Sequence, residues 1–172
     1  MRANLVKFTE SRYKTLRSRQ SFQRKGAKAM KIRDVMTDPA IRIGSSETVE
    51  VAARTLARYN IGALPVCGSD GRVCGMVTDR DLVTRCLASG HNPAQTRVEQ
   101  VMSGNVVGVP ADMEVGEAAR LMARKQVRRL PVLEQGKLKG MVSLGDLSKG
   151  DLDPVEKART LTKISSNILP EI

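Results

Sequence analysis

An internal repeat is the feature of this sequence that most constrains its fold. GMVTDRD at residues 75–81 and GMVSLGD at residues 140–146 share Gly-Met-Val, then a hydroxyl residue and then an aspartate at matching places. Pairing residue n with residue n + 66 also aligns Leu64-Pro65-Val66 with Leu130-Pro131-Val132. The offset becomes 65 after the turn-like stretches CGSDGR and LEQGK, where a change of length costs little. The same structural unit is therefore predicted twice, over residues 31–90 and 97–150.

Each unit is predicted to have the order β-α-β-β-α. A short apolar strand (40–43; 106–109) precedes a helix with apolar residues spaced i, i+3, i+4 and i+7, beginning at Val49 or Val115. Two strands joined by a hairpin follow (63–67 with 73–78; 129–133 with 137–143), and a second helix starts after Thr78 or Ser143. One unit has too few elements to cover its own sheet. We therefore expect one α/β module of two repeats packed about a pseudo-twofold axis.

The overall composition limits the class of protein. The 172 residues contain no Trp, two Phe and two Tyr, so the core must be aliphatic. Three cysteines give no paired disulfide framework, which favours a reducing compartment. No apolar run has the length of a membrane span or the form of a signal peptide. We expect a cytoplasmic protein that makes no contact with a membrane.

The net charge of +11 is concentrated at the N-terminus. Residues 1–30 contain nine basic side chains and one acidic one, whereas the other 142 residues carry a net charge of +3. We expect residues 1–29 to be a basic, disordered extension, and three interpretations of it stay open. The first interpretation is an extension without a role of its own, upstream of a module that begins near Met30. The second is an arm that contacts nucleic acid or an acidic partner, and the third is a targeting peptide. At the other end, Asp153-Pro154 predicts a last helix through about Ile164, within a C-terminal helix and tail over residues 151–172.

The repeated motif carries the candidate chemistry. A hydroxyl residue followed three positions later by an aspartate, as in Thr78/Asp81 and Ser143/Asp146, is the spacing of a capping box at a helix N-terminus. The spacing alone favours this capping role. The same groups can also face a cleft, where a carboxylate accepts from ribose hydroxyls and the helix end favours phosphate. A single histidine, His91, and the lack of a phosphate-binding loop of the GxxxxGK(S/T) type argue against an enzyme or a metal site.

The complete pattern resembles a known family. The β-α-β-β-α order, the openings Asp34-Val35-Met36 and Gln100-Val101-Met102, and the stretches IGALPVCGSDGRVCGMVTDRDLV and KQVRRLPVLEQGKLKGMVSLGDL are similar to the CBS domain. A tandem pair is a Bateman module, and residues 31–150 resemble free-standing bacterial CBS-pair proteins. The resemblance implies that each repeat contributes to two clefts that bind adenosyl ligands such as AMP, ADP, ATP, NADH or S-adenosylmethionine, with Asp81 and Asp146 holding ribose.

The resemblance also implies a set of residues for each cleft. The Ser143/Asp146 site would include Arg128, Arg129, Thr37, Ala40 and Ile41. The Thr78/Asp81 site would include Ile61, Gly62, Ala63, Ser103, Val106 and Val107. Separately from the resemblance, Arg80 lies inside the motif of this site and is a candidate partial substitute for the arginines that the site lacks. Arg128 and Arg129 stand where the first repeat has Gly62 and Ala63. Arginine binds phosphate oxygens as a fork, so we hypothesise a phosphate clamp at the Ser143/Asp146 site. The alternative is that both arginines form a solvated strand end.

The expected function is regulation rather than catalysis. The repeats occupy nearly all of the chain, so we expect a regulatory ligand-binding module that needs no cofactor and acts in trans on an unidentified partner protein. Family resemblance implies a homodimer. The alternative function is a nucleic-acid-associated protein that uses the basic arm, with the CBS pair as scaffold. We expect Cys67 and Cys74 to be small core residues, with a redox-sensitive pair as the alternative, and Cys86 to be a packing residue.

Overall fold

A computed structural model describes residues 30–148 together with Ala158 and Thr162. The predicted basic extension (1–29) and most of the predicted C-terminal segment (151–172) lie outside the described residues, and those predictions stay open. Ala158 and Thr162 are both helical, and the Thr162 hydroxyl donates to the Ala158 carbonyl at 2.9 Å.

The first repeat contains a three-stranded sheet and three helical segments. Its elements are η1 (Ile32–Asp34), β1 (Ile43–Gly44), α2 (Val49–Tyr59), β2 (Ala63–Cys67), β3 (Val73–Thr78), α3 (Asp79–Asp81) and η2 (Leu82–Leu87). Strand β2 lies between β1, which is parallel to it, and β3, which is antiparallel. Helix α3 continues directly into η2, which has π-helical hydrogen bonds.

The second repeat has the same order, with a two-stranded sheet. Its elements are η3 (Val98–Gln100), α4 (Val115–Lys125), β4 (Arg129–Glu134), β5 (Lys137–Ser143) and α5 (Leu144–Ser148). Strands β4 and β5 are antiparallel. The predicted helices, hairpins and helix starts are therefore present, and the predicted α/β class is confirmed. None of the helices in the described ranges is long and apolar enough to cross a membrane.

The first strand of each repeat differs from the prediction. The expected strand over 40–43 is reduced to β1, where Ile43 pairs with Val66, and the residues before it line cavities instead. The expected strand over 106–109 is reduced to one bridge between Val109 and Val132. The residues Val106 and Val107 before it line a cavity, as Ala40 and Ile41 do.

The two repeats exchange short segments. Ile32 precedes the first repeat's sheet, yet its N–H donates to the Met113 carbonyl at 2.9 Å and its side chain is buried in the core of the second repeat. In the matching way, the Val98 N–H donates to the Glu47 carbonyl at 2.8 Å, and Val98 lies in the first repeat's core. The structure has two cores, each completed by the segment that enters from the other repeat.

The exchange also explains the repeated Gly-Met-Val. Met76 and Ser103 exchange two backbone hydrogen bonds (2.9 and 2.8 Å), and Met141 and Thr37 do the same (3.0 and 2.8 Å). These pairs are related by the repeat offset, as a pseudo-twofold axis requires. A methyl group on Gly140 would lie 2.7 Å from the Thr37 carbonyl oxygen, so only glycine admits the exchanged segment there.

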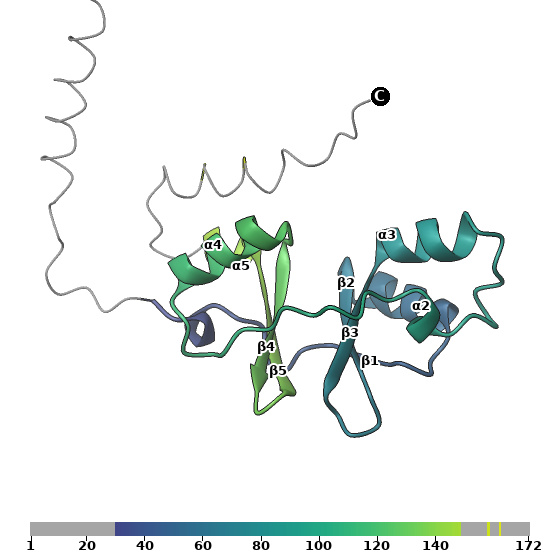
Figure 1. Cartoon of the computed structure of the whole chain (residues 1–172), viewed down its shortest axis with the longest axis horizontal. Coiled ribbons are helices and arrows are strands. Elements are labelled where there is room, and N and C mark those ends of the chain that lie inside the picture. The colour runs from purple at the N-terminus through teal and green to yellow at the C-terminus, as the bar shows by residue number, and fades with distance from the viewer. Residues whose placement is uncertain (1–29, 149–157, 159–161, 163–172) are drawn as a thin grey trace, which may run out of the picture.

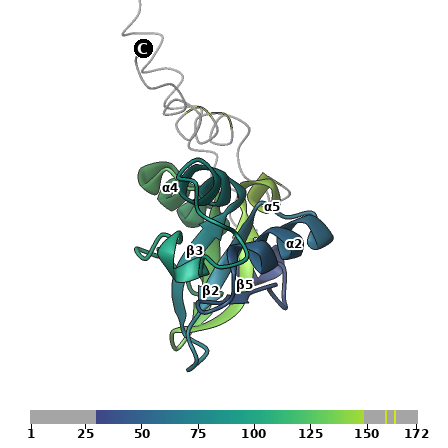
Figure 2. The same ribbon diagram turned by 90° about the vertical axis from the view of Figure 1, so that its right-hand side faces the viewer.

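The two halves lie side by side, with the hairpins β2–β3 and β4–β5 next to each other in the middle (Figure 1). Both hairpin turns point in the same direction, toward the bottom of Figures 1 and 2. The turns are joined by an isolated antiparallel bridge between Arg72 and Lys137. The exchanged segments pair with β3 at Met76 and with β5 at Met141. We therefore expect functional sites between the repeats near the ends of these two strands.

Candidate functional site

The hydroxyl–aspartate pairs form capping boxes, as the spacing predicts. The Thr78 hydroxyl accepts from the Asp81 N–H at 3.2 Å and donates to Asp81 Oδ2 at 2.7 Å, and this oxygen also accepts from the Thr78 N–H at 2.9 Å. Ser143 and Asp146 repeat the arrangement at 3.2, 2.6 and 2.9 Å. Each aspartate is therefore fixed at the start of a helix, with its side chain only partly buried.

The Thr78/Asp81 pair lines a cavity of about 430 Å³, here named cavity A. Eight residues predicted for this site line it: Gly62, Ala63, Thr78, Arg80, Asp81, Ser103, Val106 and Val107. Arg128 and Arg129 of the second repeat also line it, with the acidic Asp79. Cavity A is thus built across the repeats, and it contains three arginines and two aspartates.

The Ser143/Asp146 pair lines a smaller cavity of about 250 Å³, here named cavity B. The predicted residues Thr37, Ala40, Ile41 and Arg129 line it together with Ser143 and Asp146. Asn60, Ile61 and Ala63 of the first repeat complete the wall. Cavity B therefore contains one arginine and one aspartate, and most of its remaining lining is apolar.

Two residues line a different cavity from the one predicted for them. Arg128 lines cavity A and not cavity B, whereas Ile61 lines cavity B and not cavity A. Arg129 lines both cavities, whereas Arg128, the residue before strand β4, lines cavity A alone. Arg129 reaches across to the first repeat, since its guanidinium lies 3.3 Å from the point where a methyl group on Gly62 would stand. Of the two arginines predicted to form a clamp at Ser143/Asp146, only Arg129 lines cavity B.

Comparison with known proteins identifies the family. Two segments of the chain, residues 32–88 and 98–153, match the sequence model of the CBS domain. The chain belongs to the CBS-domain family. The CBS domain-containing protein YhcV of Bacillus subtilis is 37% identical over 134 residues, which cover 78% of this chain and 94% of the relative. Hypoxic response protein 1 of Mycobacterium tuberculosis is 36% identical over 117 residues, 68% of this chain and 82% of that protein. The resemblance deduced from the sequence is confirmed.

Solved CBS structures share the fold. The crystal structure of Hypoxic Response Protein I with two coordinated zinc ions has a TM-score of 0.66 at 35% identity, covering 72% of this chain and 100% of that one. The CBS domain pair of MJ0100, in complex with 5′-methylthioadenosine and S-adenosyl-L-methionine, has a TM-score of 0.65 at 25% identity, covering 71% and 95%. Within residues 30–148, no three His, Cys, Asp or Glu side chains of the present CBS pair form a group able to hold a metal ion.

One residue beside cavity A was missed from the sequence. Arg85 donates to the Val101 carbonyl at 2.7 Å and to the Ser103 hydroxyl at 3.2 Å, and its other terminal nitrogen lies 3.3 Å from Asp81 Oδ1. Arg85 thus ties the closing helix of the first repeat to the exchanged segment. Its spacing of four from Asp81 is an ion-pair signal on a helix, but the contact with Ser103 comes only from the tertiary structure.

The cysteines are all free, and they differ in exposure. Cys67 and Cys86 are buried, as expected for packing residues, but Cys74 is exposed and its Sγ lies 3.5 Å from the Val66 carbonyl oxygen. The expectation that Cys74 is a core residue was wrong, because β3 places alternate side chains on opposite faces. Burial raises the pKa of the Cys67 thiol, although the nearby Arg42 guanidinium acts in the opposite direction.

Proposed function

We propose that this CBS pair is a non-catalytic regulatory module that binds adenosyl ligands in cavities A and B. Cavity A takes a phosphorylated ligand such as ATP or AMP, and cavity B takes an adenosyl compound of lower charge. The observation that carries the proposal is the matched pair of capping boxes, Thr78/Asp81 and Ser143/Asp146, each placed on a cavity between the repeats.

The ribose would bind to the capping aspartates. In Asp81, Oδ2 accepts two hydrogen bonds from Thr78 and Oδ1 faces Arg85. A carboxylate has about four acceptor positions, so it still accepts from ribose hydroxyls. The neighbour MJ0100, solved with 5′-methylthioadenosine and S-adenosyl-L-methionine, supports an adenosyl ligand for this fold.

The charges favour phosphate in cavity A. Arg80, Arg128 and Arg129 line it, and Arg85 stands beside Asp81 outside the lining. Guanidinium groups bind phosphate oxygens through charge-assisted hydrogen bonds. Cavity A also falls within the usual 300–1,000 Å³ of small-molecule sites, whereas cavity B lies just below that range. This assignment reverses the preference that the sequence alone indicated.

Ligand binding would change the position of one repeat relative to the other. Each cavity is lined by residues from both repeats, while each repeat keeps its own core. A bound ligand would therefore draw the two halves together, a small rigid-body change that an interface can transmit. We further propose that the module acts in trans on a partner protein and as a homodimer, as its family resemblance implies.

Calorimetric titration with ATP and with adenosine tests the assignment. Arg128→Gln should weaken ATP binding by about tenfold or more, since a charge-assisted hydrogen bond contributes about 1.5–3 kcal/mol. Adenosine binding should hardly change. Asp81→Asn should weaken the binding of both compounds to cavity A, and Asp146→Asn should affect cavity B.

The matched control is Arg124→Gln, which removes an exposed arginine of the second repeat that lines neither cavity. If Arg124→Gln lowers ATP affinity as much as Arg128→Gln, the effect is one of net charge and the phosphate assignment fails. If neither ATP, AMP, NADH nor S-adenosylmethionine raises the melting temperature of the wild-type chain, the proposed ligand class is wrong.

A further inference from the structure

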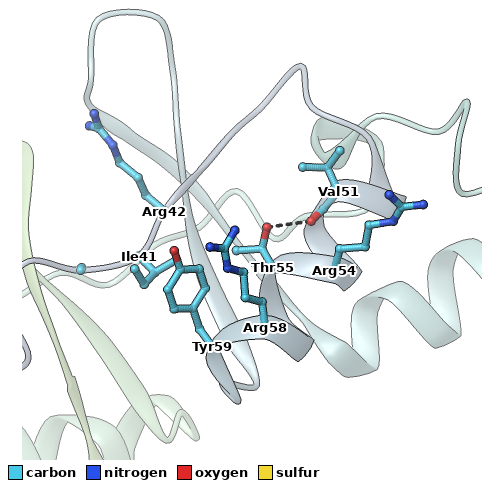
Figure 3. Close-up of a pocket in the computed structure, with 8 residues that line it drawn as sticks. Ile41, Arg42, Val51, Arg54, Thr55, Arg58 and Tyr59 are labelled. Atoms are coloured by element: carbon cyan, nitrogen blue, oxygen red, sulfur yellow. Dashed lines mark hydrogen bonds between the residues drawn. The ribbon is translucent and has the colours of Figure 1, made fainter.

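A basic groove lies on the outer side of α2, apart from both capping boxes (Figure 3). It has a volume of about 510 Å³, and its two walls are the outer face of α2 and the segment 40–42 that leads into β1. The α2 wall is formed by Val51, Arg54, Thr55, Arg58 and Tyr59. This groove is more open to solvent than the two cavities between the repeats.

The floor of the groove is partly apolar. Val51 is 40% exposed and Tyr59 is 47% exposed, which places both among the large hydrophobic side chains left open on the described surface. Figure 3 shows the Tyr59 ring beside Ile41 of the facing segment. The Thr55 hydroxyl is turned back onto its own helix, because it donates to the Val51 carbonyl at 2.8 Å. An exposed apolar stripe of this kind, bordered by charge, is typical of a protein-binding surface.

The charged residues of the groove are all arginines: Arg42, Arg54 and Arg58. Arg54 forms an ion pair with Glu50 at 2.6 Å, and Arg58 stacks over Tyr59 with 5.6 Å from guanidinium carbon to ring centre. Within residues 30–148, no carboxylate pairs with Arg42 or Arg58. Figure 3 shows the Arg42 and Arg54 side chains at opposite ends of the groove, with that of Arg58 between them. The groove therefore contains two arginines without a paired carboxylate, Arg42 and Arg58, and a third, Arg54, whose charge is offset by Glu50.

The second repeat has no equivalent of this groove in its sequence. With the offset of 66, Arg42 corresponds to Gly108, Val51 to Glu117 and Tyr59 to Lys125. The second repeat thus lacks both the aromatic residue and the first arginine, and it has a carboxylate where α2 has an apolar side chain. These differences give the first repeat a surface that the ligand cavities do not require.

We propose that the groove binds an acidic segment of the regulated partner protein, in which carboxylates alternate with apolar side chains. Arginine and tyrosine dominate the energetics of such interfaces, and the guanidiniums of Arg42 and Arg58, which no described carboxylate pairs with, match carboxylates of such a segment. The apolar floor favours a protein segment over a nucleic-acid backbone, which offers it only phosphates and sugars. A second copy placed symmetrically would bring the same arginines face to face, and the basic segment 1–30 has the wrong charge.

The groove also shares a wall with cavity B. Ala40 and Ile41 line both, so a ligand that moves this segment changes the shape of the groove. Docking itself does not depend on the adenosyl ligand. The coupling between ligand and partner rests on the function proposed above, and the two are tested separately.

The test is fluorescence anisotropy with a fluorescein-labelled peptide in which glutamates alternate with leucines, added to the full chain. The double variant Arg42→Gln with Arg58→Gln should bind it roughly tenfold more weakly, because two charge-assisted contacts are lost. Tyr59→Ser should also weaken binding while leaving the net charge unchanged. The control double variant, Arg33→Gln with Arg124→Gln, removes two exposed arginines that do not line the groove and should bind as the wild type does.

Four outcomes would overturn docking at the groove. In the first, the wild-type chain does not bind the peptide, and in the second, both double variants lose peptide affinity equally. In the third, the chain binds single-stranded oligothymidylate through Arg42 and Arg58 but does not bind the peptide. In the fourth, analytical ultracentrifugation shows that the Arg42→Gln, Arg58→Gln variant differs from the wild type in oligomeric state. Segment 1–30 is present in every variant, so any peptide bound there cancels in the comparison.

Addition of S-adenosylmethionine, an adenosyl compound of the lower-charge class assigned to cavity B, tests the coupling. If it binds by calorimetry and peptide affinity shifts severalfold, the coupling is supported. If it binds and peptide affinity stays constant, docking stands and the coupling is wrong. If it does not bind, the ligand proposed for cavity B fails, while the peptide experiment still decides on the groove.

Discussion

The substitution Gly140→Ala tests whether the glycine of the repeated Gly-Met-Val is needed to admit the exchanged segment. A methyl group at this position would stand 2.7 Å from the Thr37 carbonyl oxygen and 3.1 Å from Met36 Sδ. The oxygen belongs to the backbone and cannot rotate away. The segment that enters from the first repeat would have to move, and its two hydrogen bonds with Met141 (2.8 and 3.0 Å) would weaken or break.

The expected loss follows from three contributions. Two backbone hydrogen bonds contribute about 1 kcal/mol each. Forcing an extra methyl group into a packed site costs about 1–3 kcal/mol, and replacing glycine returns about 0.5–1 kcal/mol through the unfolded state. The free energy of unfolding should fall by roughly 2–4 kcal/mol, which corresponds to a drop in melting temperature of about 10 °C for a chain of this size.

Urea unfolding followed by circular dichroism measures this loss, and two glycines serve as controls. Gly145→Ala places its methyl group 3.6 Å from Ser143 Oγ, on an exposed position of α5, and should be neutral or slightly stabilising. Gly75→Ala meets only the side chain of Met102, which can change rotamer, so its loss should be smaller than that of Gly140→Ala. A Gly140→Ala protein as stable as the wild type would refute the argument that the exchanged segment requires glycine.

Four further perturbations have defined outcomes. Met122→Ala empties a fully buried position of the second core and should lower the free energy of unfolding by about 2–5 kcal/mol in urea titrations. Arg85→Gln should weaken ATP binding to cavity A severalfold by calorimetry, because the arginine joins two of its walls. The thiol reagent DTNB should label Cys74 in the folded protein and leave Cys67 unlabelled until unfolding. Because burial raises the pKa of Cys67, the unfolded chain loses that proton first, so melting temperature should fall as pH rises above about 8.5, and less so in Cys67→Ala.

The sequence by itself determined the features that depend on local spacing. The 66-residue offset gave the duplication, the i, i+3, i+4 pattern gave α2 and α4, and the turn compositions gave both hairpins. The capping boxes followed from two residues three positions apart, and the structure has all of their hydrogen bonds. Local patterns succeed here because each of these interactions joins residues that are close along the chain.

The tertiary structure was needed to show which core or cavity a side chain enters when segments distant in the sequence pack together. The sequence does not reveal that Ile32 and Val98 enter each other's repeats, because each is only one of many apolar residues and stands near the start of its own unit. It also grouped Arg128 with Ser143, since the two lie in one repeat, whereas the side chain lines the opposite cavity. The basic groove arises in the same way, from a helix face and a preceding segment that meet only after folding. The repeat therefore fixes which residues form two related sites, and packing across the repeats fixes the charge that each site presents.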